Sequence, residues 1–97
     1  MITHCVLFTW KLEIPEGQID TIIAGLSQMP AMIPSIRDYR FGDNLGLSPG
    51  TSDFAVVATF DDVDGWRAYD QNAFHNGVRK KDIVPWVASR TDIQFES

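Results

Sequence analysis

The stretch FAVVATF, residues 54–60, is the clearest strand signal in the chain, and the fold can be worked out from it in both directions. Its residues are apolar apart from Thr59, and its β-branched and aromatic side chains favour extended backbone. Apolar side chains occupy odd and even positions alike, so both faces of this strand should be covered in the folded protein.

Three further strands are predicted around this stretch. ITHCVLFTWK, residues 2–11, is again apolar on both faces, and residues 35–45 alternate less clearly. The segment GLSPGTSD, residues 46–53, has the composition of a loop between strands. Residues 87–95 alternate apolar or small side chains with Arg90, Asp92 and Gln94, which is typical of a last strand.

Helical periodicity occurs in the two longer gaps between strands. The first helix is expected to begin near Pro15, to bury the stripe Ile19, Ile22, Ile23 and Leu26, and to end at Pro30 and Pro34. The second is expected to be capped by Asp61 or Asp62 and to run from Val63 to about Asn72. A further helical piece is predicted from His75 to Val84, ended by Pro85.

The resulting order βαββαβ predicts a single α+β domain over residues 1–97, with a ferredoxin-like four-stranded antiparallel sheet and both helices on one face. Because helices cover only one side of the sheet, we expect residues such as Phe8, Trp10 and Val57 to leave the other side apolar. An exposed apolar face usually marks an interface. The sequence therefore predicts a homodimer joined through its sheet faces.

Composition argues against several classes of function. Eight basic and thirteen acidic residues give a net charge of −5, and the only basic cluster is Arg79–Lys81, so nucleic acid is not an expected partner. No apolar run is long enough to span a membrane. A single cysteine, Cys5, and no signal peptide at the start predict a cytoplasmic protein. The two histidines and the single cysteine lack the spacing of metal ligands, so no metal is expected. The sequence contains no glycine-rich phosphate loop, so no cofactor is expected either.

Several segments in this order resemble the stress-responsive A/B barrel (Dabb) family. They are ITHCVLFTWK, MPAMIPSIRDYRFGDNLG, SDFAVVATFDD and AYDQNAFHNGV, followed by an apolar last strand, and the likeness spans essentially the whole chain. The resemblance implies a dimeric α+β barrel of ferredoxin-like subunits. Many members of the family have no established activity.

The best-understood chemistry in this family is that of the plant olivetolic acid cyclase, an intramolecular aldol condensation of a linear polyketide thioester. The resemblance implies that its catalytic tyrosine and histidine correspond to Tyr69 and His75, and a strand histidine to His4. The cyclase has His-Pro-Ala-His where this chain has Asn72-Ala73-Phe74-His75, and a histidine where this chain has Phe54. The substrate pocket, for which Phe54, Trp66 and Phe74 are the candidate residues, should therefore differ.

The candidate site also has a purely structural interpretation. On an unbroken helix Tyr69 and His75 would lie about 240° apart, so they converge only if the helix breaks, as the resemblance implies. Otherwise Tyr69 is a core residue with its hydroxyl at the rim, His75 orients a turn, and His4 is a hydrogen-bonded core histidine.

Three kinds of function follow from these alternatives, and the sequence does not decide whether the protein is an enzyme. The first is a cofactor-free cyclase-like enzyme, with His75 as base, Tyr69 as hydrogen-bond donor and His4 as orienting group. A cofactor-free monooxygenase is a variant of it. The second is a domain that binds a small apolar or aromatic molecule between sheet and helices. The third is a stress-related structural dimer without a ligand.

Overall fold

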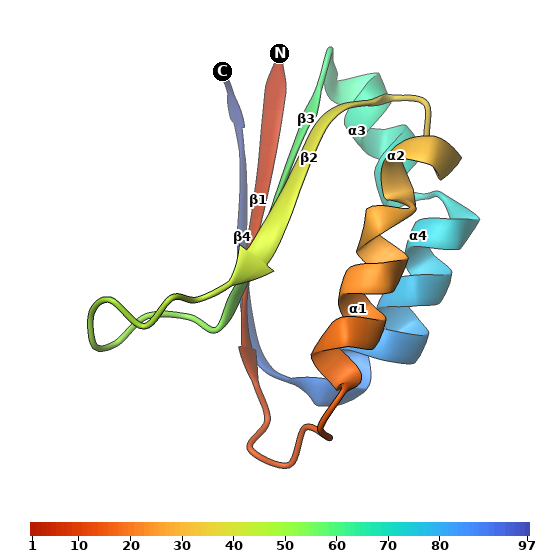
Figure 1. The fold of residues 1–97 in the computed structure, drawn as a ribbon. Coiled ribbons are helices and arrows are strands. Elements are labelled where there is room, and N and C mark those ends of the chain that lie inside the picture. The colour runs from red at the N-terminus through yellow and green to blue at the C-terminus, as the bar shows by residue number, and fades with distance from the viewer.

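The computed structural model describes residues 1–97 as one antiparallel sheet with all its helices on one face (Figure 1). The strands are β1 (Ile2–Trp10), β2 (Ile36–Asp43), β3 (Phe54–Phe60) and β4 (Val87–Glu96). The helices are α1 (Gln18–Ser27), α2 (Met29–Met32), α3 (Val63–Asp70) and α4 (Ala73–Val78). A π-helical turn (η1, Arg79–Ile83) and a 3-10 turn (η2, Val84–Trp86) follow α4 and lead into β4. None of the helices is both long and apolar enough to cross a bilayer.

The strand order β2-β3-β1-β4, with every neighbouring pair antiparallel, is the ferredoxin-like arrangement, so the predicted fold class is confirmed. The two chain ends lie together at one end of the sheet (Figure 1), where the Ser97 amide donates to the Met1 carbonyl at 2.9 Å. The central strands β1 and β3 carry the core, because they alone have a hydrogen-bonded strand on each side.

The inner face of the sheet, which the helices cover, is formed by alternate residues of each strand. On β3 these are Phe54, Val56, Ala58 and Phe60, all at most 3% exposed. On β1, Val6, Phe8 and Trp10 lie on the same side, and the Phe8 and Trp10 rings stack with centroids 5.4 Å apart. The expectation that Phe8 and Trp10 leave the outer face apolar was therefore wrong, because even positions of β1 point toward the helices.

The outer face is nevertheless apolar, through the odd positions of β1. Cys5 lies between Val57 and Ile93 across the sheet, and it is half-buried. Leu7 pairs with Ala55, and Thr3 with Phe95. Leu7, Ile93 and Phe95 are 38%, 59% and 48% exposed, so nothing in the single chain covers this face.

The helices begin and end at other residues than expected, because glycine and proline conformations set these boundaries. The first helix begins at Gln18 instead of Pro15, because Gly17 adopts φ 86° and turns the chain into the helix. Pro30 lies inside α2 near its first position, where its missing N–H is tolerated. The piece expected from His75 begins at Ala73, and Pro85 lies within η2 instead of ending the segment at Val84.

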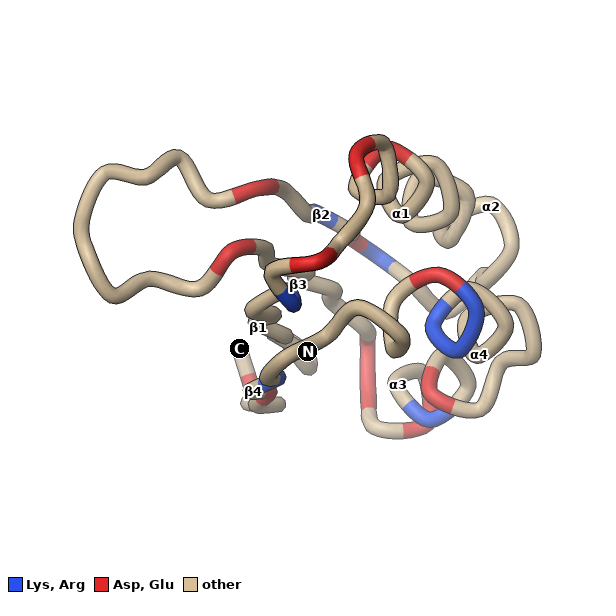
Figure 2. Tube along the Cα trace, turned by 90° about the horizontal axis from the view of Figure 1, so that it is seen from below, with Lys and Arg blue, Asp and Glu red and all other residues tan.

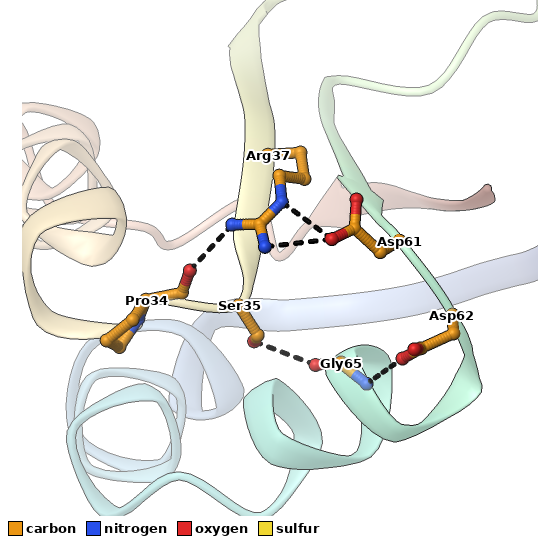
Figure 3. A network of polar contacts seen from close by, with 6 residues as sticks. All are labelled: Pro34, Ser35, Arg37, Asp61, Asp62 and Gly65. Atoms are coloured by element: carbon orange, nitrogen blue, oxygen red, sulfur yellow. Dashed lines mark hydrogen bonds and ion pairs between the residues drawn. The ribbon is translucent and has the colours of Figure 1, made fainter.

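A polar network at one end of the sheet fixes the start of α3 (Figure 3). The Asp62 side chain accepts from the Gly65 amide at 2.8 Å, which makes Asp62 the N-cap. The Gly65 carbonyl in turn accepts from the Ser35 hydroxyl at 2.8 Å, and Arg37 bridges Asp61 and the Pro34 carbonyl. This network connects α3 to β2 and β3, and so sets the position of Tyr69 near the other end of α3.

Helices α1 and α4 run side by side over the inner face (Figure 1). A Cβ atom added at Gly25 of α1 would come within 2.8 Å of the Val78 Cγ1 atom on α4, so only glycine permits this approach.

On the side away from these helices, the loop between β2 and β3 extends away from the domain and carries no charged side chain between Asp43 and Asp53 (Figure 2).

Candidate functional site

A cavity of about 480 Å³ lies between the inner face of the sheet and the layer of α1, α4 and η1. Apolar side chains form most of its lining, with a polar group at one end. The lining residues are His4, Val6, Phe8, Leu26, Met29, Tyr39, Val56, Tyr69, Asp70, His75, Asn76, Arg79, Ile83, Val84, Val87 and Arg90. Both members of the predicted pair, Tyr69 and His75, therefore share one cavity with His4.

The polar side chains of the cavity cluster around one row of residues that crosses all four strands. Tyr39 on β2, Ala58 on β3, His4 on β1 and Gln94 on β4 are direct cross-strand neighbours on the inner face. The small side chain of Ala58 leaves space between its two larger neighbours. The Tyr69 ring from α3 comes within 6.0 Å of both the His4 and the Tyr39 rings, measured between centroids.

A helix break brings Tyr69 and His75 together. Helix α3 ends at Asp70, and Asn72 adopts an extended conformation at φ −65° and ψ 133°. The Asn72 side chain then accepts from the amides of Phe74 and His75 at 2.9 and 3.2 Å, which starts α4. As a result, the Tyr69 and His75 rings lie with centroids 4.0 Å apart at an interplanar angle of 32°.

His75 is held in its neutral form. Burial, and to a lesser extent the positive charge of Arg79, lower its pKa from 6.5 to about 4, although Asp70 and the Asp70 carbonyl act in the opposite direction. Its Nδ1 atom is buried and has no hydrogen-bond partner. At pH 7 the imidazole is therefore uncharged, and one of its nitrogens carries a free lone pair.

The Tyr69 hydroxyl lies 3.0 Å from the hydroxyl of Tyr39. Burial raises the pKa of both phenols, and the shift of Tyr39 is large enough to keep it protonated at any physiological pH. When Tyr39 donates to Tyr69, the Tyr69 O–H remains free to donate elsewhere, and a donor that itself accepts a hydrogen bond is strengthened. Tyr69 is only 4% exposed, so its hydroxyl acts in a site with little water.

His4 is fixed by a polar chain along β4. Its Nδ1 atom lies 2.8 Å from Gln94 Nε2, and the same amide nitrogen donates to Asp92 Oδ2 at 3.3 Å. Because a carboxylate only accepts, the NH₂ end of Gln94 faces both groups, and His4 Nδ1 must be an acceptor. The proton of His4 then resides on Nε2. Burial lowers the pKa of His4, against the opposing effect of Asp92, which favours this neutral form.

The aromatic residues expected to line the pocket lie elsewhere. Phe54 is 2% exposed and packs between the Trp10 and Phe41 rings, with centroids 5.8 and 6.5 Å away. The Trp66 ring lies 6.3 Å from the His4 ring but borders a separate small depression near the chain ends. Phe74 packs against the core and is not part of the lining. Leucine, methionine and valine side chains take their place.

Several cavity residues were missed by sequence reasoning, above all Tyr39 and Arg79. Tyr39 falls within the less clear alternation of residues 35–45, which places it on the same face as Phe41 but gives no sign of the cavity. Arg79 was assigned to a solvated basic cluster with Lys80 and Lys81. Its spacing of four residues from His75 is the signal that could have placed both on one helix face.

The arrangement combines a neutral imidazole, a phenol donor and an apolar cavity. Such a set can remove a proton next to a carbonyl group and donate a hydrogen bond to the oxygen on which charge develops. No group of three or more histidine, cysteine or acidic side chains is arranged so that it could hold a metal ion.

The model of the Stress Responsive A/B Barrel Domain family matches residues 2–97. The chain belongs to the Dabb family. Among solved structures, a dimeric ferredoxin-like protein of unknown function from Thermobifida fusca is 41% identical, with a TM-score of 0.92 over 99% of this chain and 90% of that one. A dimeric protein of the same fold and unknown function from Bacteroides fragilis is 25% identical, with a TM-score of 0.82 over 99% and 95% of the two chains.

More distant members of the fold include a named enzyme. The hydroxynitrile lyase from Passiflora edulis superposes with a TM-score of 0.84 over 97% of this Dabb chain and 90% of its own, at 19% identity. At that identity the likeness concerns the fold alone. Among the curated proteins, none matches this sequence significantly.

Proposed function

We propose that this Dabb protein binds a small, largely apolar carbonyl compound in the cavity and catalyses a cofactor-free proton transfer on it. The observation that carries the proposal is the neutral His75 ring, which lies 4.0 Å from the Tyr69 ring on the wall of an apolar cavity. In this scheme His75 accepts a proton from the carbon next to a carbonyl, and the Tyr69 hydroxyl donates to the resulting enolate oxygen.

The low pKa of His75 restricts the substrate. A base whose conjugate acid has a pKa of about 4 is available at any pH above about 5, but it is a weak base. It can deprotonate only a carbon that is already acidic, such as a CH₂ group between two carbonyls. A β-polyketone chain provides that group together with a second carbonyl for ring closure, which makes an aldol cyclisation the reaction best suited to the site.

Tyr39 and His4 have supporting roles in this scheme. Tyr39 is the proposed donor of the hydrogen bond that joins the two hydroxyls, and this direction leaves the Tyr69 proton free to point toward the cavity. His4, with its proton on Nε2, offers a second donor for a carbonyl oxygen, and its orientation is maintained by Gln94. Tyr39 and His4 thus help to position hydrogen bonds to the substrate's oxygen atoms, whereas His75 removes the proton from carbon.

The protein is further proposed to work as a homodimer joined through the outer faces of its sheets. The apolar side chains Leu7, Val57, Ile93 and Phe95 support this, since no element of the chain covers them. The dimeric character of the Thermobifida and Bacteroides relatives supports it as well. In such a dimer each cavity stays on the helix side of its own sheet, away from the partner.

The decisive experiment combines binding and turnover. A thermal-shift screen with β-polyketone mimics and phenolic acids should find compounds that raise the melting temperature, because a ligand of the native state stabilises it by mass action. The consumption of a bound β-polyketone is then followed by ultraviolet absorbance and mass spectrometry. Binding without any turnover would contradict the proposed catalysis and leave only a binding function. The absence of both binding and turnover would contradict the whole proposal.

The two tyrosines provide a matched control. Tyr69→Phe and Tyr39→Phe both delete the same hydroxyl–hydroxyl hydrogen bond, so their effects on stability should be similar. Only Tyr69→Phe removes the proposed donor, and it should lower kcat at least about a hundredfold, while Tyr39→Phe should cost about tenfold or less. His75→Ala should abolish turnover. Equal losses in the two tyrosine variants would show that neither phenol is the donor.

A further inference from the structure

One cation in the cavity lacks an anionic partner. Arg79 is half-buried on the lining, and its one polar contact runs from Nε to the Asn76 Oδ1 atom at 3.4 Å. Its terminal nitrogens make no hydrogen bond and no ion pair with any group of the chain. A partly desolvated guanidinium that has no counter-charge in its own chain favours the binding of an anion from outside.

The other arginines of the chain show the opposite behaviour. Each of them pairs with an aspartate: Arg37 with Asp61 at 2.8 Å, Arg40 with Asp38 at 3.0 Å, Arg67 with Asp64 at 4.0 Å and Arg90 with Asp92 at 3.1 Å. These pairs lie on the surface, where an ion pair contributes little to stability. Arg79, the one arginine left without such a pair, is also more deeply placed on the cavity wall.

We propose that Arg79 anchors the carboxylate of a small carboxylic acid whose apolar or aromatic body fills the cavity. The inference rests on the proposed function of the site and adds the chemical class of its ligand. The guanidinium fork matches a carboxylate in two parallel hydrogen bonds, which also fixes the orientation of the bound molecule.

The surroundings favour a carboxylate over a phosphate. Asp70 lies on the same lining, and the protein carries a net charge of −5, so a dianion would be repelled more strongly than a monoanion. Arg90, the other guanidinium on the lining, is already neutralised by Asp92. A phosphate site normally gathers several donors, and here one free guanidinium is present.

The position of Arg79 relates the anchor to the reactive group. It follows His75 by four residues, across the end of α4, so the two side chains lie on the same helix face. A carboxylate held at Arg79 places the neighbouring carbon atoms of the acid toward the imidazole. The same carboxylate neutralises a charge that lowers the pKa of His75, so ligand binding should make His75 a stronger base.

Calorimetric titration of a matched pair of probes tests the inference. 4-Hydroxybenzoate and its neutral analogue 4-hydroxybenzamide are titrated into the wild type, Arg79→Gln and the control Arg67→Gln, which removes an arginine outside the cavity. We expect the wild type and Arg67→Gln to prefer the acid about tenfold or more, and Arg79→Gln to bind both probes equally. The melting temperature of Arg79→Gln should not fall, because it loses an unpaired charge.

The outcomes separate this inference from the proposed function. Equal binding of acid and amide by the wild type, or an acid preference that survives in Arg79→Gln, would overturn the role of Arg79 while leaving the cavity as a binding site. Binding of neither probe would also overturn the inference, whereas the proposed function is tested separately by the screen with β-polyketone mimics. Tighter binding of phenyl phosphate than of 4-hydroxybenzoate would overturn the assignment of a carboxylate. A rise in the His75 pKa on addition of 4-hydroxybenzoate, followed by NMR, would support it independently.

Discussion

The inner and outer faces of the sheet are built from alternate residues of the same strands, yet the chain seals only one of them. On the inner face of β3, Phe54, Val56, Ala58 and Phe60 are at most 3% exposed under the helices. On the outer face, Leu7, Ile93 and Phe95 remain 38–59% exposed. Strand alternation thus allows one segment to serve a pocket on one side and a proposed partner on the other.

The inner face is itself divided. At one end, Phe8, Trp10, Phe41 and Phe54 pack ring against ring. At the other, the row through Tyr39, Ala58, His4 and Gln94 is mostly polar, and its members Tyr39 and His4 line the cavity. Polar groups placed beside a close-packed core cost stability unless they are satisfied, and here Tyr39 is hydrogen-bonded to Tyr69 and His4 to Gln94.

The largest effect is expected where the inner face is most tightly packed. Phe60→Ala removes a ring that is 0% exposed and lies 5.3 Å from the Tyr69 ring, and it should lower the free energy of unfolding by about 3–5 kcal/mol. Val63→Ala, at a side chain 47% exposed, should cost less than about 1 kcal/mol. Urea denaturation measures both. Similar losses for the two variants would mean that the inner face is not the main core.

A charge on the outer face tests the other half of the comparison. Leu7→Lys should leave the fold intact and weaken the proposed dimer by at least about a hundredfold, because the interface would have to bury an unpaired ammonium group. Leu47→Lys is the control, since Leu47 lies on the projecting loop and is 85% exposed. Light scattering at micromolar concentration reports the assembly. A monomeric wild type, or a Leu7→Lys variant that stays dimeric, would contradict the proposed interface.

The polar end of the inner face should make stability depend on pH. The pKa of His75 is about 4 in the folded state and 6.5 in the unfolded state, and burial lowers the pKa of His4 as well. The unfolded chain therefore binds more protons between these values, so stability should fall as the pH decreases from about 6.5 to about 4. Allowing for the solvent that reaches His75, its share is about 1–2 kcal/mol. His75→Gln should flatten this dependence in urea titrations at stepped pH. If stability depended on pH with the same slope in His75→Gln, a group other than His75 would be responsible for the titration.

The smallest expected effect concerns the hydrogen bond between the Tyr39 and Tyr69 hydroxyls. Tyr69→Phe and Tyr39→Phe should each cost about 1 kcal/mol, and the double variant little more than either, because both delete one shared hydrogen bond. A double-mutant cycle in urea measures this coupling. Fully additive losses would mean that the hydroxyls do not interact in solution.

Much of the architecture was predictable from local patterns. Apolar runs, prolines and the β-α-β-β-α-β order correctly predicted four strands, the helical layer and the apolar outer face. The strand bounds agree with the expected ones within about two residues at each end, whereas the helix bounds differ more. Gly17, with φ 86°, and the Asn72 cap decide where helices begin, and neither position is marked by apolar periodicity.

The candidate site was predictable only in part. The resemblance to the Dabb family pointed to Tyr69, His75 and His4, which the structure gathers around one cavity. It did not point to Tyr39, whose approach to Tyr69 depends on how β2 pairs with β3 and on the position of α3 above them. The expected pocket residues Phe54, Trp66 and Phe74 are not part of the cavity lining. Their aromatic character does not indicate whether they point into a cavity or pack against the core.

By itself, the sequence determined which strands and helices form, since apolar periodicity, caps and turn residues act over a few neighbouring positions. It also determined that both faces of the central strands are apolar. Only the tertiary structure decided that Tyr39, His4, Tyr69 and His75 meet, and that Arg79 lies unpaired beside them. The contacts of Tyr69 with Tyr39 and His4 join residues far apart in the chain, and they depend on strand register and helix docking, which no local pattern encodes. Tyr69 and His75 are only six residues apart, and they meet because the helix breaks at Asn72.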